Sequence, residues 1–455
     1  MEAIKLFDIV EAVGGSFGYP GTAEITSVST DTRTITDGSV FVALRGEHFD
    51  GHDFAAKACE LGAAAAITER AVEGARCIIV DSTHKALLDL AAFYRDRFHI
   101  HLVGITGSVG KTTTKELINL VVSEKFSTLA TQGNKNNEIG LPMTLFGLTK
   151  AHGAAVIEMG MSAAGEISRL SMCARPTMAV ITNIGYSHIE NLGSQENILK
   201  AKMEILDGTE YSAPLILNLD DKLLAQIESK RDRRIIFYSL SEKGADCHAE
   251  NLCAGGGGTD FIVCYRGGSI AARLNCPGVH NVSNALAAFC VGLELGIAPE
   301  QIVRAIASYQ PAGMRQNMET VNGATFLIDC YNASPDSMKA ALGVLKELEL
   351  ASGARRFAVL SDMLELGKFA RPLHKTIGEV CAQSADVLVC CGEKAALYVE
   401  GALKKGMLPE NALHFPDLEA MTDFLAGAVK PGDAVLFKAS RGMALERAVE
   451  RLRSV

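Results

Sequence analysis

Several features of membrane-spanning, secreted and nucleic-acid-binding proteins are missing from this 455-residue sequence. No apolar run reaches the ~18 residues that a membrane-spanning helix needs. The first residues, MEAIKLFDIVEAVGG, lack the basic start and long apolar run of a signal peptide. The net charge of −9 gives no overall basic surface for a nucleic-acid backbone. We therefore expect a cytoplasmic protein with no membrane insertion and no nucleic-acid partner.

The twelve cysteines show no spacing typical of a metal site and lie in apolar stretches such as VLVCCG. This distribution favours buried, reduced thiols over disulfides, which agrees with a cytosolic location. Hydrophobic residues make up 48% of the chain and charged residues 21%, an ordinary balance for a globular protein. The length exceeds what one hydrophobic core usually supports, so we expect two or three domains.

Alternating strand-like and helix-like segments predict three α/β domains. Residues 1–100 form a small unit with short strands and a helical stretch from His52 to Leu61. Residues 101–313 predict a mostly parallel sheet with helices on both faces and an antiparallel extension between Asp246 and Pro277. A polar, glycine-containing hinge follows near Pro311 to Gly323, and residues 314–455 alternate again as a third α/β domain.

The strongest local signal is TGSVGKTTT, from Thr106 to Thr114, which lies between a predicted strand and a predicted helix. A glycine-rich turn exposes backbone N–H groups, and the helix start adds positive potential, so the segment predicts a phosphate loop for ATP. Lys111 is expected to reach the β- and γ-phosphates, and the Thr112 hydroxyl to bind Mg²⁺. The loop is a variant, because Ile105 stands where the usual pattern has glycine. The remaining predicted nucleotide contacts in this loop are Gly107, Ser108, Val109, Gly110 and Thr113.

Polar residues follow the next two predicted strands, where ligands gather in open α/β sheets. Glu158 ends the strand AAVIEMG, and His188 follows MAVITNIG. Beside a phosphate loop they are candidate ligands of a second metal ion. The alternatives are a helix cap for Glu158 and an ordinary loop histidine for His188.

Other polar positions keep two interpretations from sequence alone. Lys202 in KAKMEIL is by default a solvated lysine, and Asn284 in PGVHNVSNALAA a polar residue on a helix surface. GNKNNEIGLP, Gly133 to Pro142, groups three asparagines that suit either hydrogen bonding to a ligand or a plain turn. In DCYNASPDS, Asp329 and Asn332 are candidate functional residues, whereas Asp336 also suits a first helical turn.

Together these segments resemble the Mur ligase family along nearly the whole chain. The resemblance is carried by TGSVGKTTT, GNKNNEIGLP, EMGMSAAGEI, NIGYSHIENLGS, KAKMEI, HNVSNALAA, DCYNASPDSM and DMLELG. GNKNNEIGLP, DCYNASPDSM and DMLELG are similar to the branch that adds a dipeptide, and the DNPR signature of the tripeptide synthetases is absent. The resemblance implies a first domain for a UDP-sugar precursor, a central ATPase domain, and a Rossmann-like third domain for the incoming dipeptide.

The resemblance also implies roles for individual residues. Lys111, Thr112, Glu158 and His188 match residues that organise ATP and Mg²⁺, and Lys202 matches a carbamoylated lysine that supports the second Mg²⁺, with Lys200 as its rival. Asn281, Arg315 and Asp329 match contacts to adenine, the γ-phosphate and ribose. The implied substrate contacts are Ser29, Asp31, Thr32 and Arg33 for the uridine nucleotide, Asn134 and Asn137 for the muramoyl part, and Asn332, Asp362 and His374 for the dipeptide.

The implied activity is an ATP-dependent ligase, expected as a monomer, that joins D-alanyl-D-alanine to UDP-N-acetylmuramoyl-tripeptide through an acyl phosphate. One alternative keeps this chemistry with another amine, as in a tripeptide synthetase or a folylpolyglutamate-type ligase. A second alternative is a nucleotide-dependent switch without ligase activity. The combination of Glu158, His188 and Lys202 argues against a switch, because a switch needs no carbamoylated lysine.

Overall fold

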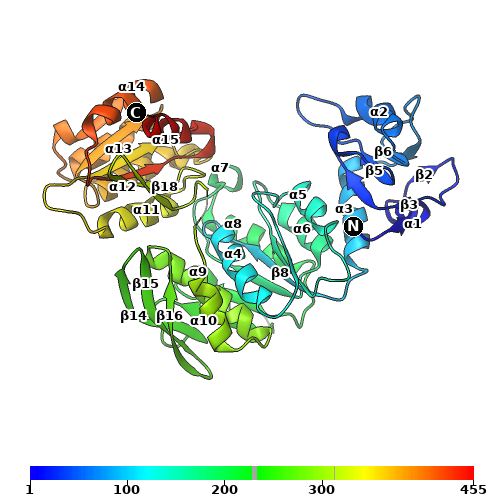
Figure 1. The fold of residues 1–455 in the computed structure, drawn as a ribbon, viewed down its shortest axis with the longest axis horizontal. Coiled ribbons are helices and arrows are strands. Elements are labelled where there is room, and N and C mark those ends of the chain that lie inside the picture. The colour runs from blue at the N-terminus through cyan, green and yellow to red at the C-terminus, as the bar shows by residue number, and fades with distance from the viewer. Residues whose placement is uncertain (228–232, 312, 455) are drawn as a thin grey trace.

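The computed structural model describes residues 1–227, 233–311 and 313–454, which form three successive α/β parts (Figure 1). The first part contains β1 (Ile4–Lys5), α1 (Leu6–Ala12), β2 (Ser16–Phe17), β3 (Glu24–Ile25), β4 (Ser27–Ser29), β5 (Ser39–Val42), α2 (Ala55–Glu60), β6 (Ala65–Thr68), β7 (Cys77–Ile79) and α3 (Thr83–Arg95). Its main sheet has the order β2-β7-β6-β5-β4, with only β2 antiparallel, while β1 pairs with β3 separately.

The central part is built on a nine-stranded sheet. It contains β8 (His101–Thr106), α4 (Lys111–Ser123), β9 (Thr128–Ala130), α5 (Gly140–Leu145), β10 (Ala154–Glu158), α6 (Glu166–Ala174), β11 (Met178–Ile181), α7 (Ile189–Leu192), α8 (Gln195–Met203), β12 (Leu215–Asn218), β13 (Ile235–Ser239), β14 (Cys247–Gly255), β15 (Gly258–Tyr265), β16 (Gly268–Leu274), α9 (Val279–Glu294) and α10 (Pro299–Ala307). The strand order is β16-β15-β14-β13-β12-β11-β8-β10-β9. The strands from β9 to β14 are parallel, and β14, β15 and β16 are antiparallel, as the sequence predicted.

Strand β8 lies where the chain changes direction across this sheet. From β8 the chain runs first to β9 and β10 on one side and then to β11 on the other. Strands β8, β10 and β11 are almost wholly buried, as expected for parallel strands that are covered on both faces. Loops at the carboxyl end of such a strand line a crevice, so the fold places the phosphate loop there.

The third part is a six-stranded sheet covered by helices. It contains β17 (Asn317–Val321), β18 (Ala324–Ile328), α11 (Pro335–Glu347), β19 (Arg356–Ser361), α12 (Ala370–Cys381), β20 (Val387–Cys391), α13 (Ala396–Lys404), β21 (Ala412–Phe415), α14 (Leu418–Ala428), β22 (Ala434–Lys438) and α15 (Glu446–Arg453). The order is β17-β18-β22-β19-β20-β21, and only β17 is antiparallel. The predicted mixed α/β fold with mostly parallel sheets is confirmed.

Different contacts join the three parts. On α3, Tyr94 donates a hydrogen bond to the Leu148 carbonyl at 2.6 Å, and buried Arg95 donates to the Ala174 carbonyl at 3.0 Å. Between the central and third parts, the Glu190 amide donates to the Glu365 carbonyl at 3.2 Å. Residue 312, inside the predicted hinge, lies outside the described residues.

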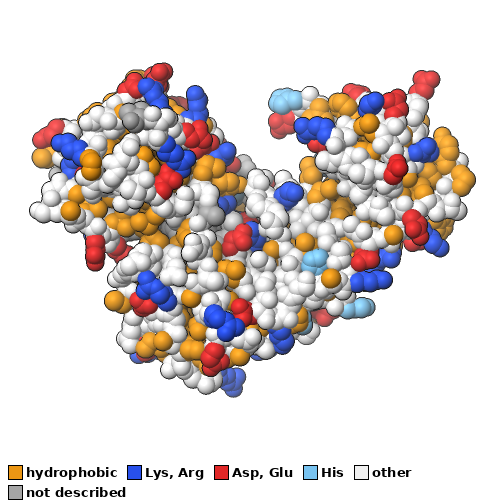
Figure 2. All heavy atoms as spheres, viewed as in Figure 1, with side chains coloured by type: hydrophobic (Ala, Val, Ile, Leu, Met, Phe, Trp, Pro, Cys, Tyr) orange, Lys and Arg blue, Asp and Glu red, His pale blue; other side chains and the backbone are white. Residues whose placement is uncertain are grey.

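Figure 2 shows an open hollow between the first and third parts, with the central part below it. Within the described residues, no helix is both long enough and apolar enough to cross a membrane.

Candidate functional site

The phosphate loop leaves the end of β8 and enters α4 through two glycines in left-handed or related conformations. Gly107 has φ +150° and Gly110 has φ +84°, which other residues rarely adopt. A Cβ on Gly110 would lie 2.6 Å from Asn284 Oδ1, so the loop also lacks room for a side chain there. Ile105, the departure from the usual pattern, is a buried β8 residue in the sheet core. Its side chain therefore serves packing of the sheet.

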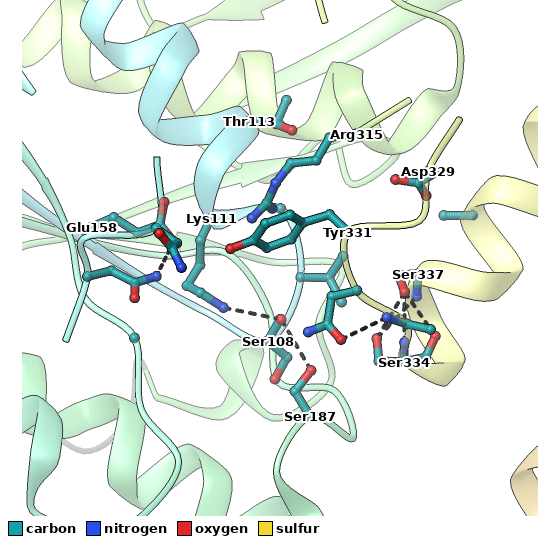
Figure 3. Close-up of a pocket in the computed structure, with 18 of the residues that line it drawn as sticks. Ser108, Lys111, Thr113, Glu158, Ser187, Arg315, Asp329, Tyr331, Ser334 and Ser337 are labelled. Atoms are coloured by element: carbon teal, nitrogen blue, oxygen red, sulfur yellow. Dashed lines mark hydrogen bonds between the residues drawn. The ribbon is translucent and has the colours of Figure 1, made fainter. Parts of the chain in front are cut away.

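Lys111 begins α4 and reaches back over its own loop. Its Nζ donates a hydrogen bond to the Gly107 carbonyl at 2.8 Å. It also donates to the Ser108 carbonyl at 3.4 Å, as Figure 3 shows. Burial lowers the pKa of Lys111, an effect that the Glu158 charge opposes and the Arg315 charge reinforces. A cavity of ≈ 350 Å³ adjoins this ammonium group and is also lined by Ser108, Val109, Gly110 and Thr113.

Glu158 ends β10 with a buried carboxylate that two neutral side chains hold in place. Thr112 donates its hydroxyl to Oε2 at 2.9 Å, and Asn136 donates its amide to Oε1 at 2.7 Å. Hydroxyl and carboxylate oxygens are the ligands that Mg²⁺ prefers, so this pair beside the phosphate loop fits such an ion. The helix-cap alternative for Glu158 is wrong, because the residue lies in a strand and its side chain makes these two contacts.

His188 has left-handed backbone geometry, φ +61°, directly before α7. Its Nδ1 lies 2.6 Å from Glu365 Oε2 of the third part, and this contact lowers the pKa of Glu365. The imidazole also lines the cavity. His188 therefore joins the phosphate-binding region to the segment DMLELG.

Lys202 is buried on α8, with 2% of the residue exposed, whereas Lys200 is exposed. The default interpretation of Lys202 as a solvated lysine is wrong. Burial holds its pKa well below the ordinary value, and the Lys111 charge lowers it further. An uncharged amine is the form that reacts with CO₂, so this environment fits a carbamate at Lys202.

The start of α9 presents a buried network of amides. The Asn281 amide donates to the Pro277 carbonyl at 2.8 Å and to Gln316 Oε1 at 2.6 Å. Asn284 Oδ1 accepts from the Thr114 hydroxyl at 3.1 Å. Asn284 is 7% exposed, so its interpretation as a helix-surface residue is wrong. Burial lowers the pKa of His280, which also contacts Gln316.

The third part completes the cavity wall. The Arg315 guanidinium lies over the Tyr331 ring at 4.0 Å from its centroid, and Figure 3 shows the two side by side. Asp329 follows β18 and pairs with Lys438, the last residue of β22, at 2.5 Å. Asn332 lines the same cavity. Asp336 lies in the first turn of α11, as its alternative interpretation predicted.

The three asparagines of GNKNNEIGLP lie beside the same cavity but make different contacts. Asn134, Asn136 and Asn137 all line the cavity, and Asn137 Oδ1 also accepts from the Gly140 amide at 2.8 Å, at the start of α5. Sequence reasoning missed the Asn136 contact with Glu158, as well as Tyr331, Gln316 and Lys438. The position of Lys438 at the carboxyl end of a strand was the available signal for that residue.

Two predicted dipeptide contacts lie outside the cavity. His374 is fully buried, its Nε2 accepts from the Met363 amide at 3.1 Å, and its Nδ1 lies 2.8 Å from the Ala370 carbonyl. Asp362 is 4% exposed and accepts from the Lys394 amide at 3.1 Å. In this arrangement His374 has no free ring nitrogen for a substrate and supports the segment DMLELG at Met363. Asp362, the first residue of that segment, fixes the backbone at Lys394.

The predicted uridine contacts form a separate cluster in the first part. Ser29 ends β4, Asp31 precedes a short 3₁₀ turn at Thr32–Thr34, and the Asp31 carboxylate pairs with Arg33 at 2.5 Å. The Arg33 side chain lowers the pKa of Asp31 to about 2. None of these four residues lines the cavity beside the phosphate loop.

Comparison with known proteins identifies one family across the chain. The family models match in order: "Mur ligase family, catalytic domain" at residues 24–95, "Mur ligase middle domain" at 105–292, and "Mur ligase, glutamate ligase domain" at 314–441. The UDP-N-acetylmuramoyl-tripeptide–D-alanyl-D-alanine ligase of Bacillus subtilis is 38% identical over 453 residues, covering 98% of this chain and 97% of that protein. The ligase of the same name from Escherichia coli is 34% identical and covers 94% of each chain.

Solved structures agree over the full length. A crystal structure of MurF from Acinetobacter baumannii has a TM-score of 0.93 at 32% identity, with 100% of both chains covered. MurF ligase from Thermotoga maritima in complex with ADP has a TM-score of 0.84 at 30% identity, covering 94% of this chain and 97% of that one.

Proposed function

This chain belongs to the Mur ligase family, and from that premise we propose that it joins D-alanyl-D-alanine to UDP-N-acetylmuramoyl-tripeptide at the expense of ATP. The product is the UDP-MurNAc-pentapeptide of peptidoglycan synthesis, with ADP and phosphate. The observation that carries the proposal is that Lys111 of the phosphate loop and Arg315 of the third part line the same cavity. Full-length similarity to ligases named for this reaction supports the choice of substrates.

The three parts divide the substrates between them in this proposal. Residues 1–100 bind the UDP precursor through Ser29, Asp31, Thr32 and Arg33, and residues 101–313 bind ATP. Residues 314–455 receive the dipeptide, with Asn332 as the contact that lines the cavity. Asp362 and His374, which are buried outside the cavity, support the surrounding backbone and do not contact the dipeptide directly. The matched ranges 24–95, 105–292 and 314–441 support these boundaries. Asn134 and Asn137 face the muramoyl peptide from the central part.

The reaction must first make a carboxylate electrophilic. A carboxylate resists attack because its charge is delocalised and oxide is a poor leaving group. Transfer of the γ-phosphoryl group gives an acyl phosphate, which the neutral dipeptide amine attacks with loss of phosphate. Lys111 and Arg315 supply two cations that neutralise charge on the transferring group, which is most of what phosphoryl transfer requires. Asn281 and Asp329 hold the adenine and the ribose.

Two Mg²⁺ ions are part of the proposal. Thr112, Glu158 and His188 would hold them, together with a carbamate on Lys202. Bound Mg²⁺ neutralises phosphate charge and orients the phosphoryl oxygens. The chain's own contribution is orientation: Asn136 and Thr112 fix the Glu158 carboxylate from both sides. Buried Lys202 offers the uncharged amine that carbamate formation consumes.

We also propose that the protein works as a monomer in the cytoplasm, with roles in cell shape and cell division that follow from cell-wall synthesis. All twelve cysteines are free thiols, and nine of them are buried, which agrees with a reducing compartment.

The test is phosphate release from ATP with UDP-MurNAc-tripeptide, with and without D-alanyl-D-alanine. Release that needs both substrates, with the pentapeptide mass in the product, supports the proposal. Release that ignores the dipeptide contradicts the amine assignment, and a panel of other amines then separates a tripeptide synthetase from a folylpolyglutamate-type ligase. Full-rate hydrolysis without any acceptor would favour a nucleotide switch. Precursors with lysine and with diaminopimelate at the third position should both be tried.

A matched variant separates ATP chemistry from precursor binding. Lys111→Ala should abolish turnover and leave binding of the UDP precursor largely intact, because the predicted uridine contacts lie in another part. Equal loss of both would contradict this division between the parts.

A further inference from the structure

The antiparallel extension of the central sheet carries three side chains with metal-binding chemistry on one face. His248 of β14 lies directly opposite Cys264 of β15, and Glu250 follows two residues after His248. Residues opposite each other, and residues two apart on a strand, point to the same side of a sheet. The local fold therefore places an imidazole, a thiol and a carboxylate together.

The ligand atoms of these three residues converge. One donor atom of each lies within 4.8 Å of the others, and His248 Nε2 is 3.6 Å from Glu250 Oε1. All three residues are partly buried. His248 Nδ1 is buried and, within the described residues, has no hydrogen-bond partner. Nδ1 is therefore not committed to a hydrogen bond, and a metal bound at either ring nitrogen would fix the tautomer of the imidazole.

The competing interpretation is a solvated strand face with an ordinary ion pair. Lys243 Nζ lies 2.6 Å from Glu250 Oε1, and 78% of the lysine side chain is exposed. Exposed ion pairs are weak, so this contact is easily exchanged for another cation. It leaves the proximity of His248 and Cys264, and the unpartnered nitrogen, unexplained.

We propose that His248, Glu250 and Cys264 form a binding site for a divalent transition metal of the Zn²⁺ type. Thiolate, imidazole and carboxylate suit Zn²⁺ and its neighbours, whereas Mg²⁺ prefers oxygen ligands alone. Three protein ligands leave a fourth tetrahedral position for water or another small ligand. The site ties β14 to β15 across the hairpin.

This site is separate from the nucleotide cavity. Strand β14 lies four strands from β8, which is about 19 Å at the usual strand spacing. Figure 1 shows the extension at the margin of the central part, beside α9 and α10. Its test therefore does not depend on the proposed ligase activity.

The first experiment follows alkylation of individual cysteines in the full-length protein, after chelator treatment and with or without added Zn²⁺. Peptide mass spectrometry reports each thiol. We expect Zn²⁺ to slow alkylation of Cys264 at least tenfold. Exposed Cys253 on the same hairpin is an internal control and should react at an unchanged rate. Equal rates at Cys264 with and without Zn²⁺, or equal protection of both cysteines, would overturn the site.

Variants test the ligand set. His248→Ala and Glu250→Gln should remove most of the protection of Cys264, while Cys253→Ser should keep it. Lys243→Gln should strengthen Zn²⁺ binding several-fold, because it removes the cation that competes for Glu250. Co²⁺ gives a second readout: its thiolate charge-transfer band should appear in the wild type and vanish in Cys264→Ser. Protection that persists in His248→Ala, or a band that persists in Cys264→Ser, would contradict the proposal.

Discussion

Lys438 and Asp329 form an ion pair in the wall of the nucleotide cavity, with Nζ 2.5 Å from Oδ2. Only 2% of the lysine side chain and 14% of the aspartate side chain are exposed. The same ammonium donates to the Asn332 carbonyl at 3.1 Å. One cation from β22 therefore holds both the carboxylate assigned to ribose and the turn that carries Tyr331 and Asn332.

Lys438→Met should destabilise the protein and weaken ATP binding. Removing one member of a buried ion pair leaves the other charge uncompensated, at a cost of about 3–5 kcal/mol. Urea denaturation and the KM for ATP measure the two effects. Lys404→Met is the matched control, since Lys404 pairs with Glu379 at 2.7 Å but is 76% exposed. A similar loss of stability in both variants would contradict the argument.

Tyr331→Ala should lower kcat, because Arg315 loses the ring that holds its guanidinium. A cation–π contact is worth about 1 kcal/mol, so we expect a decrease of roughly fivefold. Tyr331→Phe keeps the ring and should retain most of the activity. The prediction is wrong if the phenylalanine variant falls as far as the alanine variant.

Asn136→Ala should raise the Mg²⁺ concentration needed for half-maximal activity. The substitution removes one of the two hydrogen bonds that fix the Glu158 carboxylate. Asn134→Ala, at another position on the same cavity wall, is the comparison. Activity is measured across a Mg²⁺ titration at saturating ATP. Overlapping curves for Asn136→Ala and wild type would contradict the role of Asn136 in Mg²⁺ binding.

Lys202→Met should abolish ligase activity, and Lys200→Met should not, because only Lys202 is buried. The lowered pKa of Lys202 increases the uncharged fraction that reacts with CO₂ at neutral pH. Protein equilibrated with ¹³C-bicarbonate should show a carbamate signal by NMR that is missing from Lys202→Met. A signal of equal size in that variant would place the carbamate elsewhere.

Asp336→Asn should stabilise the protein at neutral pH. Burial raises the pKa of Asp336, with help from the Asp221 charge, and its Oδ2 has no hydrogen-bond partner within the described residues. A raised carboxyl pKa means that the folded state binds the proton more tightly than the unfolded chain. The contribution to stability is therefore present at low pH and is lost as the pH rises through the folded pKa.

The melting temperatures of Asp336→Asn and wild type should accordingly differ most near pH 7. The difference should shrink as the pH falls toward 3.8, the ordinary pKa of the group. A melting-temperature difference that grows at low pH would contradict a raised pKa for Asp336.

Much of the fold could be predicted because local patterns and tertiary structure agree here. The strand end at Glu158, the helix start at Lys111 and the antiparallel extension all follow from periodicity and glycine placement. The burial of Lys202 and Asn284 could not be predicted in this way, since their neighbours in sequence read as ordinary amphipathic helix. Pairing of Lys438 with Asp329 joins strands 109 residues apart, and only the strand order brings them together.

The functional-site residues could be predicted less completely than the fold. The nucleotide contacts expected of the loop after β8 remain predictions, but the loop conformation at Gly107 and Gly110 follows from the local sequence. Asp362 begins the recognisable segment DMLELG and His374 follows on α12, yet the orientation of a side chain depends on packing that a motif does not encode. Both ring nitrogens of His374 contact backbone groups, which no residue spacing could have revealed.

The nucleotide cavity has walls from two separately folded sheets, with Lys111 on one and Arg315 and Asp329 on the other. Affinity for ATP is therefore also a measure of how closely those sheets approach. His188 and Glu365 mark one place where they touch. A compound that bound between His188 and Glu365 would keep the two sheets apart. It would therefore compete with ATP without resembling a nucleotide.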